Sequence, residues 1–155
     1  MVQIENLIEK TPSFKQITAD LQPKNHQLIT GISGSARTEL LSALSKEGRR
    51  PILVVTDTIS HMQELASDLE NLLPANRVYQ FPVEEVLAAE VATSSPNYRL
   101  QRVLALNALI NNEPAVVVAS AAGLRRNIIS PEYFAQSSLK IKTGGEVDPA
   151  KIRQQ

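Results

Sequence analysis

The sequence contains no cysteine, which excludes disulfides and zinc sites built on thiolates and fits a reducing cytosol. Aromatic residues make up only 4% of the chain, whereas hydrophobic residues make up 43%. Since so few rings are present, the core must be built mainly from aliphatic side chains.

Neither sign of charge is in excess, because 16 Lys and Arg residues balance 16 Asp and Glu residues. This balance gives no support for nucleic acid or a membrane surface as a partner. The N-terminal segment MVQIENLIEK lacks the basic and apolar regions of a signal peptide. The longest apolar run, residues 115–124, is too short to span a bilayer. We therefore expect a soluble, cytoplasmic protein with no membrane partner.

Short apolar runs alternate with helical patterns along the first four-fifths of the chain. The expected strands are residues 28–30, 51–55, 77–81 and 115–119, and the helices between them are residues 37–46, 58–73 and 98–111. This alternation predicts an α/β fold with a parallel sheet and helices on both faces. Residues 51–55 form a continuous apolar run, which is typical of a strand buried on both faces.

The pattern changes after Arg126. Residues 139–142 alternate between apolar and polar as a half-exposed strand does, and Asp148-Pro149 has the residues of a helix start. The chain stops at Gln155, about one turn later, so we expect the second domain to be cut short. We predict a first domain over residues 1–127 and the start of a small α+β domain over residues 128–155.

Residues 28–41 read LITGISGSARTELL, an apolar segment followed by a Gly/Ser loop and a helix. This order is typical of the P-loop G-x-x-x-x-G-K-[ST], whose backbone N–H groups hold phosphates and whose lysine reaches the outer ones. Gly31 and Thr38 fall in register with that motif, and Gly34 lies within the loop. Ala36 stands at the second glycine, and Arg37 stands at the lysine.

Both replacements weaken a phosphate site. The second glycine allows the backbone to approach phosphate closely, and the planar guanidinium of Arg37 does not replace a compact ammonium. Residues 116–120 also lack an acidic residue that could help to hold Mg²⁺. We predict a vestigial phosphate loop at these five positions: Gly31, Gly34, Ala36, Arg37 and Thr38. An active P-loop NTPase with an atypical loop stays open as the alternative.

Other candidates for catalysis or metal binding have little support. His26 and His61 are not accompanied by Asp or Glu at the spacing of metal ligands, and no serine lies in a G-x-S-x-G turn. Glu84 and Glu85 are adjacent in sequence, so they do not face each other on a helix. We expect no catalytic residue, no metal site and no cofactor in this chain. A nucleic-acid-binding module is the weakest alternative because the charge is balanced.

Four segments together resemble a known family: GISGSARTELL, RRPILVVTDTISHMQELASDL, VYQFPVEEVLAAEVATSSPNYRLQRVLALNALI and VVVASAAGLRR. They are similar to the N-terminal region of bacterial transcription-repair coupling factors (Mfd), over about residues 10–150. That region is itself similar to the excision-repair protein UvrB, which keeps an intact P-loop. UvrB also carries an aromatic-rich β-hairpin between the segments that match Phe81 and Tyr98, whereas residues 82–97 here contain no aromatic residue.

The resemblance implies a degenerate P-loop NTPase fold of the RecA-like class that has lost ATP hydrolysis and damage probing. In this family the full-length protein displaces RNA polymerase stalled at DNA lesions and recruits UvrA. ATP and Mg²⁺ serve a separate C-terminal motor. The UvrB-like module is a scaffold for recruitment and autoinhibition, and it contacts other domains of the same protein. Its UvrA surface belongs to the second domain, and the matching residues would follow Gln155.

Overall fold

The structure, a computed structural model, describes residues 5–48, 50–83, 96–125, 127–138 and 144. The chain divides into two compact units, Met1–Arg125 and Arg126–Gln155. The domain boundary expected after residue 127 stays a prediction. Among the described helices, none is both long enough and apolar enough to cross a membrane.

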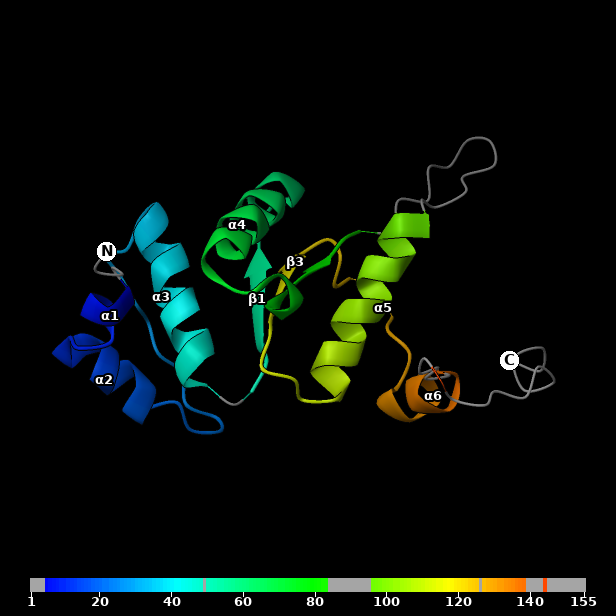
Figure 1. The fold of residues 1–155 in the computed structure, drawn as a ribbon, viewed down its shortest axis with the longest axis horizontal. Helices are drawn as coiled ribbons and strands as arrows, with labels where there is room; N and C mark the ends of the chain where they lie inside the picture. The colour runs from blue at the N-terminus through cyan, green and yellow to red at the C-terminus, as the bar shows by residue number, and fades with distance from the viewer. Residues whose placement is uncertain (1–4, 49, 84–95, 126, 139–143, 145–155) are drawn as a thin grey trace. The chain divides into compact units, whose positions relative to one another are not determined.

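The first unit contains a parallel sheet of three strands and the helices around it (Figure 1). Its elements in chain order are α1 (Glu5–Ile8), α2 (Pro12–Ala19), α3 (Ser35–Glu47), β1 (Ile52–Thr56), α4 (Ile59–Leu72), the 3₁₀ turn η1 (Ala75–Arg77), β2 (Val78–Phe81), α5 (Pro96–Ile110) and β3 (Val116–Ser120). The order of the strands is β1-β3-β2, so the last of the described strands is central in the sheet. The predicted α/β class with a parallel sheet is confirmed.

The central strand β3 is buried over its whole length. It pairs with β1 and β2 in parallel, and Val116 lies opposite both Ile52 and Val78. Successive side chains of a strand point to opposite faces, so two separate apolar clusters form. Val116 and Val118 belong to one cluster, and Val117 and Ala119 belong to the other.

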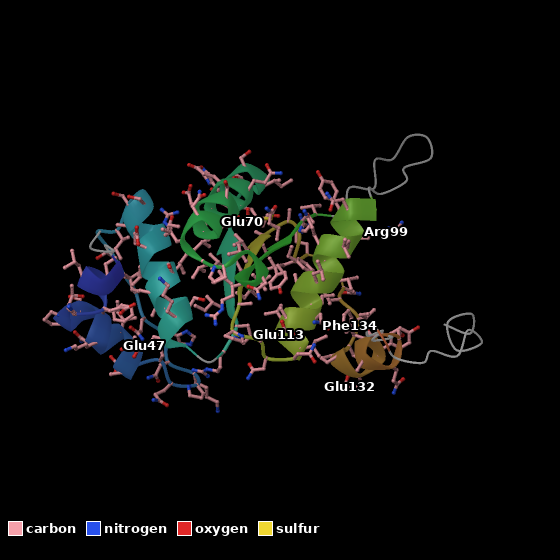
Figure 2. The ribbon with its side chains drawn as sticks, viewed as in Figure 1. Glu47, Glu70, Arg99, Glu113, Glu132 and Phe134 are labelled. Atoms are coloured by element: carbon pink, nitrogen blue, oxygen red, sulfur yellow. The ribbon has the colours of Figure 1, made fainter. Side chains whose placement is uncertain are left out.

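Each face of the sheet is covered by one main helix. Helix α4 packs its apolar stripe against all three strands, through Met62, Leu65, Ala66 and Leu69. Helix α5 packs on β2, and its Ala105 joins the cluster on the opposite face. The stripe on α4 follows the i, i+3, i+4, i+7 spacing read from the sequence. Figure 2 shows the polar side chains Glu47, Glu70 and Arg99 on α3, α4 and α5, where all three are exposed.

The strand predicted at residues 28–30 is wrong. These residues have no regular secondary structure, and the exposed fraction of Leu28 is 90%. The preceding residue, Gln27, instead donates a side-chain hydrogen bond of 3.0 Å to the backbone oxygen of Ile17 in α2. A strand needs a neighbour for its backbone groups, and no described strand lies beside this segment.

The prediction that residues 51–55 are buried on both faces is also wrong. In β1 the residues alternate between half-buried and exposed, and the exposed fractions are 46% for Leu53 and 53% for Val55. These side chains are exposed because β1 lies at one edge of the described sheet, whereas α5, which covers this face, packs on β2 at the opposite edge.

The second unit contains a short helix, α6 (Pro131–Gln136), which the sequence analysis did not predict. Ser130 caps it, because its hydroxyl oxygen accepts a hydrogen bond of 3.3 Å from the backbone N–H of Tyr133. Ser followed by Pro is a known helix start, so the signal was present in the sequence. The strand expected at residues 139–142 and the helix start at residue 148 lie outside the described residues.

Candidate functional site

The loop before α3 depends on two glycines with positive φ. The φ of Gly31 is 80°, and Gly34, which caps α3, has a φ of 56° and a ψ of −137°. A Cβ atom added at either glycine would meet no atom within 4 Å. The dihedral angles, rather than a lack of space, therefore require glycine here. The turn closes with a hydrogen bond of 3.1 Å from the backbone N–H of Arg37 to the oxygen of Gly34.

We expect Gly34→Ala to lower the free energy of unfolding by about 1–3 kcal/mol, because the backbone at Gly34 lies in a region that other residues enter only with strain. Urea denaturation measures this loss. Ser33→Ala is the matched control, because Ser33 is exposed and has no positive φ, and it should change the stability by less than about 0.5 kcal/mol. Equal effects of the two substitutions would show that the glycine is not required by the turn.

The remaining loop residues lie on the first turn of α3, which begins at Ser35 and so earlier than the predicted residue 37. Ala36 and Arg37 are exposed, whereas the exposed fraction of Thr38 is only 4%. The five predicted residues of the vestigial loop, which are close in sequence, therefore lie in the turn before α3 and on the first turn of that helix.

Two hollows lie beside this segment. The first has a volume of about 340 Å³, and its lining residues come from the start of α3 and from α4: Gly34, Ser35, Arg37, Thr38, His61, Glu64, Leu65 and Asp68. The second, of about 370 Å³, shares Arg37, His61 and Leu65 and extends along the end of β1 to Thr56 and Asp57. The carboxyl ends of parallel strands are where α/β proteins bind ligands, so this position is suitable for a site.

The charges around the hollows oppose a phosphate ligand. Arg37 and His61 line both hollows. The first hollow also contains the carboxylates of Glu64 and Asp68, and the second contains that of Asp57. A nucleotide phosphate brings several negative charges, and like charges at close range repel. No lysine is found among the described residues that line either hollow.

Asp57 and His61 form a hydrogen-bonded pair at the start of α4. The distance between His61 Nδ1 and Asp57 Oδ1 is 2.6 Å, and the same oxygen accepts a bond of 2.9 Å from the backbone N–H of Thr58. The hydrogen bond that His61 Nδ1–H donates to Asp57 raises the pKa of His61 above its ordinary value, and the negative charge of Asp57 adds to this shift. The bond from His61 in turn lowers the pKa of Asp57.

This pair was not predicted from the sequence, although a signal was present. Asp57 follows an apolar strand directly, and His61 lies four residues later on the first turn of the next helix. Residues at this spacing are neighbours on a helix surface. Among the described residues, no group of three or more His, Cys, Asp or Glu residues could hold a metal ion.

We expect the His61 ring to titrate above pH 6.5, its ordinary pKa, and the substitution Asp57→Asn to lower the pKa of His61. The raised His61 pKa gives stability that is complete below pH 6.5 and is lost as the pH rises through the folded pKa. The lowered Asp57 pKa gives stability present above pH 3.8 that is lost as the pH falls through the folded pKa. Since both side chains are exposed, the pKa measured by NMR is the better readout.

The matched control for this titration is Asp68→Asn, which removes a carboxylate from the first hollow, also lined by His61, without removing the hydrogen bond between Asp57 and His61. The Asp68→Asn substitution should leave most of the rise in the His61 pKa unchanged. An equal fall of the His61 pKa in both variants would contradict the assignment of the shift to Asp57.

The fold and the loop define the class of protein: an α/β domain with a parallel sheet and a glycine-dependent turn at a helix start. Comparison with known proteins identifies its relatives. The chain is 35% identical to the transcription-repair-coupling factor of Bacillus subtilis (strain 168) over 153 residues, which is 98% of this chain and 13% of the relative. No family model matches the chain, and no solved structure does.

Further relatives carry the same name. The chain is 23% identical to the transcription-repair-coupling factor of Staphylococcus aureus (strain bovine RF122 / ET3-1) over 96% of its length. It is also 23% identical to that of Staphylococcus haemolyticus (strain JCSC1435) over 94% of its length. The chain spans 12–13% of the length of these relatives. The resemblance to the N-terminal region of transcription-repair coupling factors is confirmed. The further likeness to UvrB stays a prediction.

Proposed function

We propose that this chain is a non-catalytic N-terminal module of a transcription-repair coupling factor and acts as a scaffold for recruitment and autoinhibition. Its fold would be a degenerate member of the RecA-like P-loop class, related to UvrB. The longer protein would displace RNA polymerase stalled at DNA lesions, in an ATP-dependent manner, and recruit UvrA. ATP and Mg²⁺ would be used by its C-terminal motor, which lies outside this chain.

One observation of the site carries the non-catalytic part of this proposal. The hollow in front of α3 places Arg37 among the carboxylates of Glu64 and Asp68, and Asp57 adds a third at the end of β1. A working P-loop uses a lysine on the outer phosphates and a metal ion held between protein and nucleotide. The negative charges of these carboxylates would repel the phosphates of a nucleotide, which supports a module that does not bind one.

An active P-loop NTPase with an atypical loop is the second candidate, and one observation favours it. Gly31 and Gly34 hold the turn in conformations that suit glycine, and α3 begins directly after them. The N-terminus of a helix presents free N–H groups and a positive partial charge, which attract anions. Binding of Mg-ATP separates the two candidates.

The recruitment role is tested by capture of UvrA. We expect the 155-residue chain to capture little or no UvrA, and a polypeptide that continues through the second domain to capture it in a saturable manner. Equally tight capture by both chains would place the contact surface within residues 1–155 and contradict the proposed surface. No capture by the longer polypeptide would overturn the recruitment role itself.

A further inference from the structure

Helix α4 places two carboxylates at the first hollow without a partner for either. Glu64 and Asp68 both line this hollow of about 340 Å³, and both are exposed. They are four residues apart on α4, so they are neighbours on its surface, and like charges at this spacing repel each other. Neither side chain forms an ion pair or a hydrogen bond with a described residue. The pair therefore lacks a cation.

The hydroxyl of Thr38 is an independent observation on the α3 side of the same hollow. The exposed fraction of Thr38 is only 4%, yet its hydroxyl forms no hydrogen bond with any residue that the structure describes. The fully enclosed polar atoms without a partner are one oxygen each of Glu39 and Ser45, so the Thr38 oxygen is open to the hollow that it lines. Buried polar groups in folded proteins nearly always have a partner, which suggests that the partner of Thr38 enters from outside.

An apolar side chain lies between the two carboxylates. Leu65 follows Glu64 directly, is buried with an exposed fraction of 8%, and lines the same hollow. Long basic side chains pack their CH₂ groups against apolar surface while the charged end reaches polar groups. The hollow thus combines an apolar wall with three sets of oxygen acceptors, those of Glu64, Asp68 and Thr38.

The positive residue already at the hollow does not satisfy these acceptors. Arg37 lines the hollow, but its guanidinium forms no ion pair with a carboxylate in the described part of the chain. Single exposed ion pairs are weak, so a site on this surface needs several acceptors that act on one cation. A guanidinium carries five N–H donors in a planar fork, whereas an ammonium carries three on a single atom. Arginine therefore fits two carboxylates and a hydroxyl better than lysine does.

We propose that this hollow receives an arginine side chain of a partner protein. The guanidinium donates hydrogen bonds to the carboxylates of Glu64 and Asp68 and to the hydroxyl of Thr38, and its CH₂ groups pack against Leu65. Charge complementarity is the argument for this occupant, because the carboxylates that oppose a phosphate attract a cation. The inference goes beyond the proposed function and does not depend on the capture of UvrA.

Titration with a tetra-arginine peptide, followed by the NMR signals of Leu65 and Thr38 in the 155-residue chain, tests the proposal. We expect saturable shifts, and the double substitution Glu64→Gln and Asp68→Asn should weaken binding at least about fivefold, because the charge-assisted hydrogen bonds are lost. The matched control is Glu47→Gln with Glu70→Gln, which makes the same change in net charge at exposed residues that do not line the hollow. Equal losses in the two double variants would overturn the proposal.

The hydroxyl is tested by Thr38→Val, which keeps the shape of the side chain. Since the hydroxyl forms no described hydrogen bond, the variant should retain the free energy of unfolding but should bind the peptide about twofold or more weakly. A clear loss of stability would show that the hydroxyl bonds within the chain and would count against the site. A tetra-lysine peptide should bind at least about threefold more weakly than tetra-arginine. Equal affinity for the two peptides would contradict a guanidinium site.

Two other occupants have distinct outcomes, and each would overturn the proposal. If Arg37 filled the hollow in solution, tetra-arginine would not bind the unmodified chain but would bind the Arg37→Gln variant. If a segment of the longer protein filled it, the peptide would bind the 155-residue chain but not a polypeptide of the same protein that continues past residue 155. We expect the peptide to bind both chains with similar affinity and to shift the signals of Leu65 and Thr38 in each.

Discussion

Replacement of Val117 by aspartate is expected to unfold the first unit. Val117 lies in the central strand, its exposed fraction is 0%, and its neighbours in the cluster on the α5 side are apolar. A carboxylate buried there would have no charged partner in that cluster, and burying an unpaired charge is among the most destabilising changes known. We expect a loss above about 4 kcal/mol, a large part of the roughly 5–15 kcal/mol that stabilises a typical domain.

The matched control is Leu53→Asp, because Leu53 lies directly opposite Val117 in the parallel ladder. Its half-exposed side chain allows a carboxylate to remain in water, so we expect a loss of less than about 1 kcal/mol. Circular dichroism and urea denaturation measure both variants. Similar losses of unfolding free energy at the two positions would show that the side chains of Leu53 and Val117 are equally buried, which would contradict the structure.

Removal of the Phe81 ring is expected to have the next largest effect. The exposed fraction of Phe81 is 2%, and the guanidinium of Arg102 lies 3.9 Å from the centre of its ring. Arg102 also donates a hydrogen bond of 2.7 Å to the oxygen of Pro82, so this pair joins α5 to the end of β2. We expect Phe81→Ala to lower the free energy of unfolding by about 3–5 kcal/mol, through lost burial and a cavity.

Phe81→Leu is the control for this prediction, because it keeps an apolar side chain of moderate volume and removes the ring. We expect it to cost less than the alanine substitution, by about 2 kcal/mol, with the remaining loss due to the ring contact with Arg102. A loss below about 1 kcal/mol for Phe81→Ala would contradict the packing of α5 against β2.

The buried parts of the fold could be predicted from the sequence because their pattern depends on local chemistry. The apolar run at residues 116–120 contains no charged residue, and it forms the strand buried on both faces. The leucines and alanine of α4 follow helical spacing, and Thr58 caps that helix by accepting a bond from the backbone N–H of His61. Each of these features is encoded within a few residues of the sequence.

The parts that sequence alone could not predict depend on neighbours distant in the chain. Residues 28–30 have the composition of a strand but lack a described partner strand. Residues 51–55 have the composition of an inner strand, but β1 lies at an edge of the described sheet. The five loop residues stay a predicted phosphate loop, and the structure adds only that Gly31 and Gly34 adopt positive φ angles, which are typical of glycine. The carboxylates that share its hollows come from α4 and from the end of β1, and so only the folded chain brings them together.

The central claim, that this module does not use a nucleotide, is tested most directly by calorimetry with millimolar Mg-ATP. We expect no saturable binding by the unmodified chain, because no lysine and three carboxylates line the described hollows. The double substitution Ala36→Gly and Arg37→Lys should likewise create no ATPase, since the central strand β3 (residues 116–120) carries no acidic residue that could help to hold Mg²⁺. Saturable binding of Mg-ATP by the unmodified chain, lost on Thr38→Ala, would contradict the account and favour an active P-loop.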